Sequence, residues 1–428
     1  MDKTVVAHSL PALETELSPA ANSRQEFRRS WHIVLATLVG VGFGVNGFSY
    51  AAFGVFVNPL AQAFGRSISA ISGWVTFLFL GCTAVSPFIG MLADRIGARR
   101  VILLSIPLFA LTLGVAGAIG TQLWMLYLIA LAAGSIGTGA SPVTYGRVVN
   151  TWFETGRGAA LGIMSSGIGL SYLFGPRLVQ SIVDAHGWRL GFFFMAVAHL
   201  LPLPLMVFWL RERREMVAQS SRTVETGHTV REAVHLPVFW CAGAAFLLYG
   251  LCAGGVTLNM IPFLTASGLS RASAATYVGL LGVFSVTGRV VTGFVIDRLH
   301  VAFVCAIILL MEAVAFAAFG WFETRFVVMA ISVTGFAFGG EISCMGYAIA
   351  RYFGVKHYGA IYGLLSVVCG IGVGLGPPVF SFLREISGVY SVPFFVSAGL
   401  AVGAAAFFAI LGIYPFFKGP MITANSPT

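Results

Sequence analysis

The chain has 428 residues, of which 57% are hydrophobic and only 10% are charged. Soluble globular domains carry about 25% charged residues, so this composition excludes a soluble protein and indicates a membrane protein. The formal net charge of +9 does not indicate a nucleic-acid-binding protein, because the basic residues lie in short groups between long apolar stretches.

Twelve apolar stretches are long enough to cross a bilayer as helices, which takes about 20 residues each. We expect these spans at 32–61, 70–92, 100–119, 123–149, 157–183, 188–210, 237–264, 272–297, 301–321, 325–352, 358–384 and 391–417. The chain contains 52 glycines, and small residues let helix backbones approach closely in lipid.

Polar segments divide the chain into five parts. We expect a tail at 1–31, a six-helix bundle at 32–210, a linker at 211–236, a second bundle at 237–417 and a tail at 418–428. In the linker, Thr229 followed three residues later by Glu232 predicts a capped short helix on the membrane surface.

Positive charge is distributed unevenly over the loops. Of the 25 Lys and Arg residues, 18 fall on the side of the termini and the linker, and 5 fall on the opposite side. The positive-inside rule then places both termini and the linker in the cytoplasm, with the chain in the inner or plasma membrane. The polar first residues show no cleavable signal pattern.

Features of soluble enzymes and metal sites are missing from the sequence pattern. All six cysteines fall inside apolar spans without metal-ligand spacing, and the histidines are scattered. The sequence has no phosphate-binding glycine loop for ATP. We therefore expect no metal, no cofactor and no enzymatic activity.

The two halves of the chain repeat each other. The segment from Gly90 to Arg95 matches the segment from Gly293 to Arg298 at an offset of 203. A set of glycines and a proline recurs at an offset of 201: Gly158, Gly162, Gly169, Gly175, Pro176 and Gly187 match Gly359, Gly363, Gly370, Gly376, Pro377 and Gly388. The predicted fold is an all-α membrane protein with twelve transmembrane helices in two pseudo-symmetric six-helix bundles.

The pattern Gly90-x3-Asp94-Arg95-x-Gly97-x-Arg99-Arg100 resembles the signature loop of the major facilitator superfamily. Within it, the chain resembles the monocarboxylate porter and oxalate–formate antiporter group. The residues that carry this resemblance are Asn46–Tyr50 with Phe53–Phe56, Trp152-Phe153 with Gly156–Gly162, Arg289 with Gly293 and Asp297, and Gly359-x-Ile361-Tyr362-Gly363.

The sequence departs from that group at three places. Ser285 stands where members often carry an aspartate one turn before the arginine of span eight. Span one has no lysine, as eukaryotic members often have, and span eleven has no lysine, as oxalate-type members have.

Arg289 lies deep inside span eight and is the main candidate for binding substrate. A guanidinium stays charged at usable pH, and placing one near the bilayer centre costs roughly 3 kcal/mol or more. Its planar fork can hold a carboxylate with two parallel bonds, which points to an anionic substrate. The alternative is a permanent structural ion pair.

Glu341 in span ten is predicted at a depth within about one turn of Arg289. It is our candidate for proton coupling; the alternatives are a structural pair with Arg289 and a substrate contact without coupling. Arg177 is expected at the outer mouth or the interface. Glu312 is expected to be neutral or paired, in a helix that the resemblance places on the periphery.

Two further groups of residues complete the candidate site. The resemblance implies gating contacts between the halves at the cytoplasmic helix ends, from Asp94, Arg95, Asp297 and Arg298. Polar side chains expected toward the bundle interior, as substrate contacts or helix-to-helix hydrogen bonds, are Asn46, Tyr50, Asn259 and Tyr347, with Tyr145 nearer the cytoplasmic end.

The sequence therefore predicts a secondary active transporter that moves a small organic anion, first of all a monocarboxylate, by alternating access with proton symport. The single central cation favours one carboxylate over two. The alternatives are an organic-anion exchanger of the oxalate–formate type and a transporter-like sensor or channel. The expected partners are the organic anion, protons and the lipid bilayer, with no nucleic acid, and the chain is expected to act as a monomer.

Overall fold

The computed structural model describes residues 19–66, 68–118, 122–210 and 227–411. These residues are almost entirely helical, and their one β-bridge joins Gly227 to Gly354. Eleven segments are long and apolar enough to cross a membrane. One of them, Arg157–Trp209, has 53 residues and would be about 80 Å long as one helix, which exceeds the ~30 Å hydrocarbon core.

Gly187 divides that long segment into two spans. The helix α7 (Arg157–Leu200) has non-helical backbone angles at Gly187, where φ is +81°, a region that glycine enters without strain. The break lies between the predicted spans 157–183 and 188–210, and α8 (Pro202–Trp209) completes the second. The described chain therefore has the twelve crossings and the all-α class that the sequence predicts.

Two predicted spans are interrupted in the structure. The first consists of α1 (Pro19–Gly42), the π-helix η1 (Val45–Ser49) and α2 (Tyr50–Phe64), so residues 19–31, which we expected in the tail, are helical. The fourth consists of α5 (Leu123–Gly137), the 3-10 turn η2 (Thr138–Ala140) and α6 (Pro142–Trp152). Pro142 at the start of α6 has no N–H to continue the preceding helix.

The other spans are single helices. In the first half these are α3 (Ile68–Ile96) and α4 (Ala98–Ala118). In the second half they are α11 (Pro237–Ala266), α12 (Arg271–Ile296), α13 (Val301–Phe322), α14 (Val327–Phe353), α15 (Tyr358–Ser387) and α16 (Ser391–Ile410). The linker helix α10 (Val230–His235) begins with the predicted capping box of Thr229 and Glu232. The rest of the predicted linker, 211–226, lies outside the described residues.

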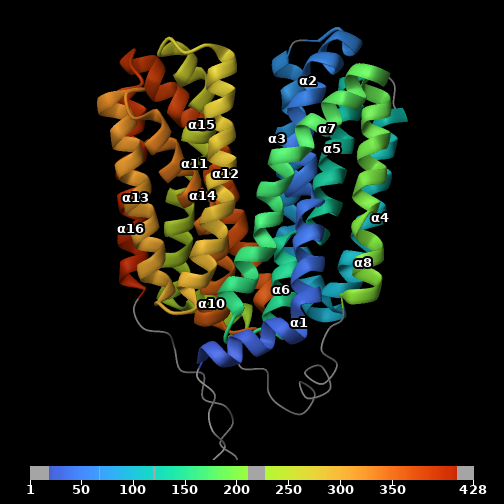
Figure 1. Ribbon diagram of the computed structural model, residues 1–428, viewed down its shortest axis with the longest axis vertical. Helices are drawn as coiled ribbons and strands as arrows, with labels where there is room; N and C mark the ends of the chain where they lie inside the picture. Colours follow the sequence, from blue (N-terminus) through green and yellow to red (C-terminus); the bar gives the residue numbers. More distant parts are fainter. Residues whose placement is uncertain (1–18, 67, 119–121, 211–226, 412–428) are drawn as a thin grey trace, which may run out of the picture.

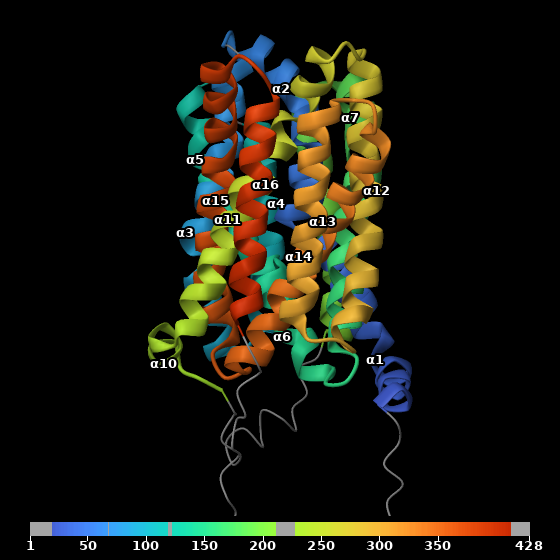
Figure 2. The same ribbon diagram turned by 90° about the vertical axis from the view of Figure 1, so that its left-hand side faces the viewer.

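The helices form two groups that meet at one end. In Figure 1 the blue-to-green helices stand on the right and the yellow-to-red helices on the left. One hydrophobic cluster lies in each group, around Phe56 and Phe192 in the first and around Phe263 and Phe394 in the second. A third cluster joins residues of both groups, among them Phe153 and Tyr358. Helix α1 starts and α16 ends at the same lower end of the molecule (Figures 1 and 2).

Glycines bring the two groups into backbone contact. A Cβ atom on Gly293 of α12 would lie 2.5 Å from the carbonyl oxygen of Gly158 in α7. A Cβ atom on Gly363 of α15 would lie 2.6 Å from the Cα of Pro87 in α3. Both distances are too short for a side chain, so only glycine permits these crossings, which pair α7 with α12 and α3 with α15.

Candidate functional site

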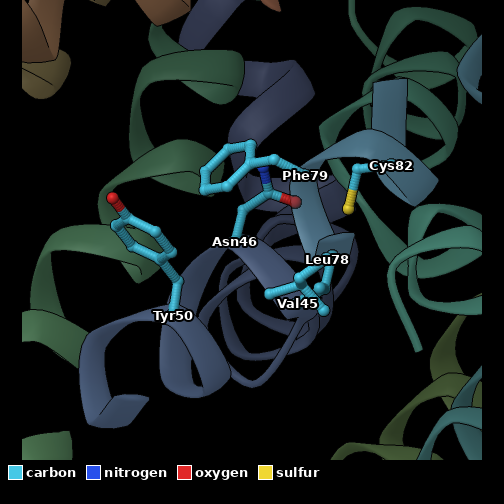
Figure 3. A pocket seen from close by; sticks show the side chains of 6 residues that line it. All are labelled: Val45, Asn46, Tyr50, Leu78, Phe79 and Cys82. Atoms are coloured by element: carbon cyan, nitrogen blue, oxygen red, sulfur yellow. The ribbon is translucent and has the colours of Figure 1, made fainter. Parts of the chain in front are cut away.

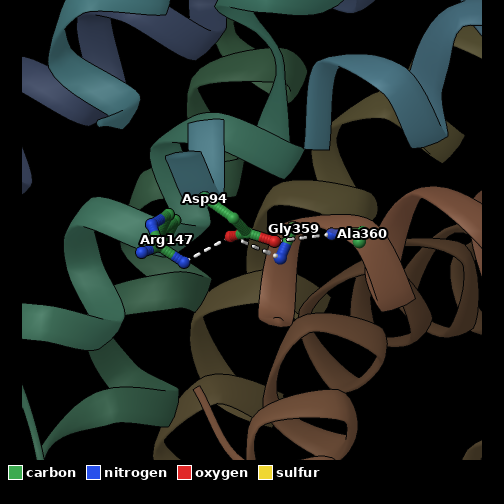
Figure 4. A network of polar contacts seen from close by, with 4 residues as sticks. All are labelled: Asp94, Arg147, Gly359 and Ala360. Atoms are coloured by element: carbon green, nitrogen blue, oxygen red, sulfur yellow. Dashed lines mark hydrogen bonds and ion pairs between the residues drawn. The ribbon is translucent and has the colours of Figure 1, made fainter. Parts of the chain in front are cut away.

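Asp94 joins the two halves at the end where they meet. Its carboxylate accepts hydrogen bonds from the backbone N–H groups of Gly359 (3.2 Å) and Ala360 (3.0 Å) and forms an ion pair with Arg147 (Figure 4). Gly359 and Ala360 are in the first turn of α15, where unpaired N–H groups and the helix dipole favour a negative charge. Asp94 therefore acts as a cap supplied by the opposite half.

Asp297 makes the equivalent contact on the other side of the pseudo-symmetry axis. Its carboxylate accepts from the N–H groups of Gly158 (2.6 Å) and Ala159 (2.9 Å), in the first turn of α7. Burial raises the pKa of Asp297 to about 6, against the opposing effect of these two N–H groups and of Arg157. The two caps close this end of the molecule, and we call it the capped end.

The two arginines next to these aspartates do not share the contacts. Arg95 and Arg298 are exposed, and among the described residues neither side chain forms a hydrogen bond or ion pair. In this conformation the contacts between the halves come from Asp94 and Asp297, and Arg95 and Arg298 take no part in them; the gating role of all four stays a prediction. The ion pair with Asp94 is formed by Arg147, which the sequence analysis did not select.

The π-helix η1 displays Asn46 at mid-span. Asn46 is exposed, although its neighbours Val45 and Gly47 are buried, and it lines a small pocket with Tyr50 and Phe79. In Figure 3 the Asn46 amide points toward the side of α3 that carries Phe79 and Cys82. π-Helical turns often occur at functional sites because they redirect one side chain out of the regular helix.

A buried histidine holds this irregular turn in place. Ser49 lies 3.0 Å from His199 Nε2, and His199 Nδ1 lies 2.7 Å from the carbonyl oxygen of Met195. Because a carbonyl can only accept, Nδ1 carries the hydrogen and Nε2 accepts from the Ser49 hydroxyl. His199, far along the chain in α7, therefore fixes the π-helix at the level of the pocket.

Aromatic residues connect this pocket with the second half. The Tyr50 ring packs edge-on against Phe79 at 5.1 Å and lies 6.0 Å from the ring of Tyr172 in α7. Tyr172 also interacts electrostatically with Arg289 of α12. Asn46, Tyr50, Tyr172 and Arg289 thus form a continuous path between the halves, of which the sequence analysis missed Tyr172.

Arg289 is fully buried and has no acidic partner among the described residues. Only 1% of its surface is exposed. Its Nη1 donates to the carbonyl oxygen of Ser285 (3.2 Å) and to the Ser285 hydroxyl, and its Nε has no partner. The partner one turn away is thus the neutral Ser285, where the resemblance led us to look for an aspartate, and the Arg289 charge has no acidic partner among the described residues.

Glu341 lies at the same level as Arg289 on the neighbouring helix α14. The Ser343 hydroxyl is 3.5 Å from the Arg289 carbonyl oxygen, and a Cβ atom on Gly340 would lie 2.7 Å from Thr292 Oγ1. These contacts on both sides of Glu341 confirm the predicted depth. Neither Glu341 carboxyl oxygen has a hydrogen-bond partner in the described part of the chain, so the alternative of an Arg289–Glu341 ion pair does not form in this conformation.

Glu312 lies on the buried side of α13, a helix whose other side exposes large apolar residues such as Ile307 and Val314. It is 0% exposed, unpaired among the described residues, and its charge acts on Glu341. The Tyr249 hydroxyl of α11 is also buried without a partner there, and it interacts with both carboxyls. The sequence analysis did not select Tyr249, because nothing in the local pattern shows which helices face each other.

The remaining candidates lie outside this group. Asn259 joins α11 to α15: its Nδ2 donates to the Gly255 carbonyl (2.8 Å) and its Oδ1 accepts from Ser381 (3.1 Å). Tyr347 lies about one and a half turns after Glu341 on α14. Its ring centre is 5.9 Å from the Arg351 guanidinium. Arg177 is exposed, as expected. Tyr145 is buried, and its hydroxyl has no partner among the described residues.

Comparisons with known proteins agree with this architecture. A family model described as Major Facilitator Superfamily matches residues 39–333. The chain is 24% identical over 401 residues to a gallate transporter of Pseudomonas putida, covering 82% of this chain and 87% of the relative. It is 25% identical over 397 residues to monocarboxylate transporter 11 of Mus musculus, covering 88% and 86%. The structure of the human organic anion transporter MFSD10 superposes with a TM-score of 0.70 at 16% identity, covering 89% of this chain and 99% of that one.

Proposed function

The chain belongs to the Major Facilitator Superfamily, and on this premise we propose that it carries a small organic anion across the membrane by alternating access, with proton symport. It is a multi-pass membrane transporter and not an enzyme. The observation that supports an anionic substrate is Arg289, a buried guanidinium at mid-span without an acidic partner among the described residues. A cation in this position is costly unless an anion compensates it.

The aromatic path supports a substrate with one carboxylate and an apolar or aromatic body. One fork of Arg289 can take one carboxylate in two parallel bonds. Tyr50, Phe79 and Tyr172 offer ring faces between Arg289 and the Asn46 amide. The relatives named for gallate and for monocarboxylates transport carboxylates, which agrees with this substrate class.

The direction of closure follows from the charge distribution. The capped end carries the basic loop side, which the positive-inside rule places in the cytoplasm of an inner or plasma membrane. The capped conformation is then closed toward the cytoplasm, and both termini are cytoplasmic. Breaking the Asp94 and Asp297 caps would let the halves rock about the central site and open it inward. We expect one chain to suffice for this cycle.

In the proposed proton symport, Glu341 carries the proton. A substrate anion on Arg289 brings one negative charge to the level of Glu341, so protonated Glu341 and bound substrate are compatible, whereas two adjacent anions are not. Release of both on the other side completes net transport. An exchanger of the oxalate–formate type is the second candidate, favoured by Ser285, which leaves the usual acidic position of the span-eight arginine neutral.

A binding and transport experiment tests the proposed substrate site. Purified protein in proteoliposomes is given lactate, pyruvate, gallate and benzoate, with a pH gradient as the driving force. We expect uptake of at least one of these acids, and we expect Arg289→Lys to lose most of it, since an ammonium lacks the planar fork. Arg177→Lys, at an exposed position of α7, is the matched control. Wild-type uptake by a correctly inserted Arg289→Lys variant would overturn the site.

A further inference from the structure

The first part of α1 packs on the loop between α6 and α7. In Figure 1 this dark-blue part runs along the lower end of the molecule, which is the capped end. The Phe27 ring lies 5.0 Å from the ring of Phe153, measured between centroids. A Cβ atom on Gly156 would lie 2.7 Å from Ser23 Oγ and 2.9 Å from Phe27 Cε2. Residues 23–31, which the sequence analysis assigned to a tail, are therefore in direct contact with the loop.

The Glu26 carboxylate binds the backbone of this loop. Its Oε1 accepts from the N–H groups of Glu154 (3.2 Å) and Thr155 (3.2 Å) and from the Thr155 hydroxyl (3.4 Å). Its Oε2 accepts from the N–H group of Gly156 (3.0 Å). Hydrogen bonds to an ionised acceptor are stronger than neutral ones, so three successive N–H groups on one carboxylate fix the path of the loop.

The loop leads into the helix start that the second half caps. Gly156 is the N-cap residue of α7, and Asp297 accepts from two N–H groups in the next turn. The charge of Glu26 repels that of Asp297, but it affects Asp297 less than those two N–H groups and Arg157 do. The main consequence of the Glu26 contacts is therefore that the segment bound by Asp297 is ordered.

The corresponding loop of the second half is held in a different way. The repeat offset of 201 places residues 354–357 at the equivalent position, in front of α15. There Gly227 of the linker forms the β-bridge with Gly354, and the His228 N–H donates to the Phe353 carbonyl oxygen (2.8 Å). Both are backbone contacts, whereas the first half uses a side chain that one substitution can remove.

We propose that residues 23–31 form a latch of the capped end, in which Glu26 keeps the loop 153–156 ordered for the Asp297 cap. An ordered loop loses less conformational freedom when the cap forms, so the latch favours the capped conformation. Glu26 is a positioning residue, because it acts on Asp297 through the start of α7. An event that pulls residues 23–31 off the loop would then favour opening of this end.

The inference rests on the proposed function in one respect, that separation of the capped end is part of the transport cycle. It goes beyond that function by making the segment before the first span a control element of the cycle. Substrate and proton binding play no part in it.

Hydrogen–deuterium exchange and spin-label distances test the latch in the full chain, reconstituted in lipid nanodiscs without substrate. Glu26→Ala removes all the acceptor atoms, and Glu26→Gln keeps one acceptor oxygen with almost unchanged shape. Gln25→Ala, at the exposed neighbouring position of the same helix, is the matched control. The spin labels are placed at Arg95→Cys and Arg298→Cys, which are exposed positions at the capped end.

A latch predicts that the two measurements change together. In Glu26→Ala the amides of residues 154–156 should exchange at least about tenfold faster, since their opening no longer breaks bonds to a carboxylate. The fraction of molecules with the long label distance should rise severalfold. Glu26→Gln should lie between wild type and Glu26→Ala, and Gln25→Ala should match wild type in both measurements.

Three results would overturn the latch. Faster exchange of the loop with unchanged label distances would mean that order in the loop has no effect on the capped end. Unchanged exchange in Glu26→Ala would mean that Glu26 does not hold the loop. Equal shifts in Gln25→Ala and Glu26→Ala would assign the effect to the helix and not to the carboxylate.

The outcome is separable from that of the proposed function. If the protein transports none of the tested carboxylates but Glu26→Ala shifts the label distances, the proposed substrate class is wrong and the latch stands. If Arg289→Lys abolishes uptake but Glu26→Ala leaves the distances unchanged, the substrate site stands and the latch is overturned.

Discussion

The Gly359 N–H donates a 3.2 Å hydrogen bond to the Asp94 carboxylate, across 265 positions of the sequence and from one half of the molecule to the other. Asp297 and Gly158 repeat this bond at 2.6 Å with the halves exchanged. Each half thus ends a helix with an acid that caps the first turn of a helix in the other half. Because the internal repeat places one such acid in each half, the same contact forms twice at this end of the molecule.

Removing either cap should open the capped end. Asp94→Asn and Asp297→Asn each lose the interaction of a negative charge with a helix N-terminus, which is about 1 kcal/mol or about fivefold in population. We expect the larger effect from Asp94→Asn, because it also leaves Arg147 without its ion pair. The measurement is the distance between spin labels at Arg95→Cys and Arg298→Cys, both exposed positions.

Asp184→Asn is the control for these variants, since Asp184 is exposed on α7 and its carboxylate accepts only from Gln180 of the same helix among the described residues. It should leave the label distances unchanged. Unchanged distances in Asp94→Asn and Asp297→Asn as well would show that the caps do not hold the halves together.

A methyl group at Gly90 should force the halves apart. The Cβ atom of an alanine there would overlap the Gly359 carbonyl group, which belongs to the backbone and cannot rotate away. We expect Gly90→Ala to disfavour the capped conformation and to reduce transport severalfold without loss of membrane insertion. Gly54→Ala is the matched control, because nothing lies within 4 Å of its Cβ position. Equal transport by the two variants would mean that the crossing of α3 and α15 is looser than the structure indicates.

Glu341→Gln should separate exchange from accumulation. The glutamine imitates a permanently protonated carboxyl, so the variant should bind and exchange the substrate, because exchange needs no proton release. It should lose most accumulation driven by a pH gradient, since net transport requires deprotonation on the return step. Counterflow and gradient-driven uptake in proteoliposomes measure the two activities.

Loss of binding together with uptake in Glu341→Gln would instead indicate that Glu341 supports the substrate site directly. Unchanged accumulation would exclude Glu341 as the proton carrier.

Much of the architecture follows from local properties of the chain. The length of apolar stretches determines the spans, because each must satisfy its own backbone hydrogen bonds in lipid. The recurrence of Gly158 and Gly359, and of Asp94 and Asp297, reveals the twofold repeat. Counting along spans eight and ten places Arg289 and Glu341 at one depth, because an α-helix rises by a constant step per residue.

Only the tertiary structure decided which side chains meet. The sequence does not show that Arg289 bonds to Ser285, or that the carboxyls of Glu312 and Glu341 are buried without a hydrogen-bond partner among the described residues. Depth in a membrane is set by position along one helix, whereas contact depends on how each helix is rotated about its axis. That rotation results from packing against several neighbours at once, through glycine crossings and irregular turns such as η1, and the sequence of a single span contains little of that information.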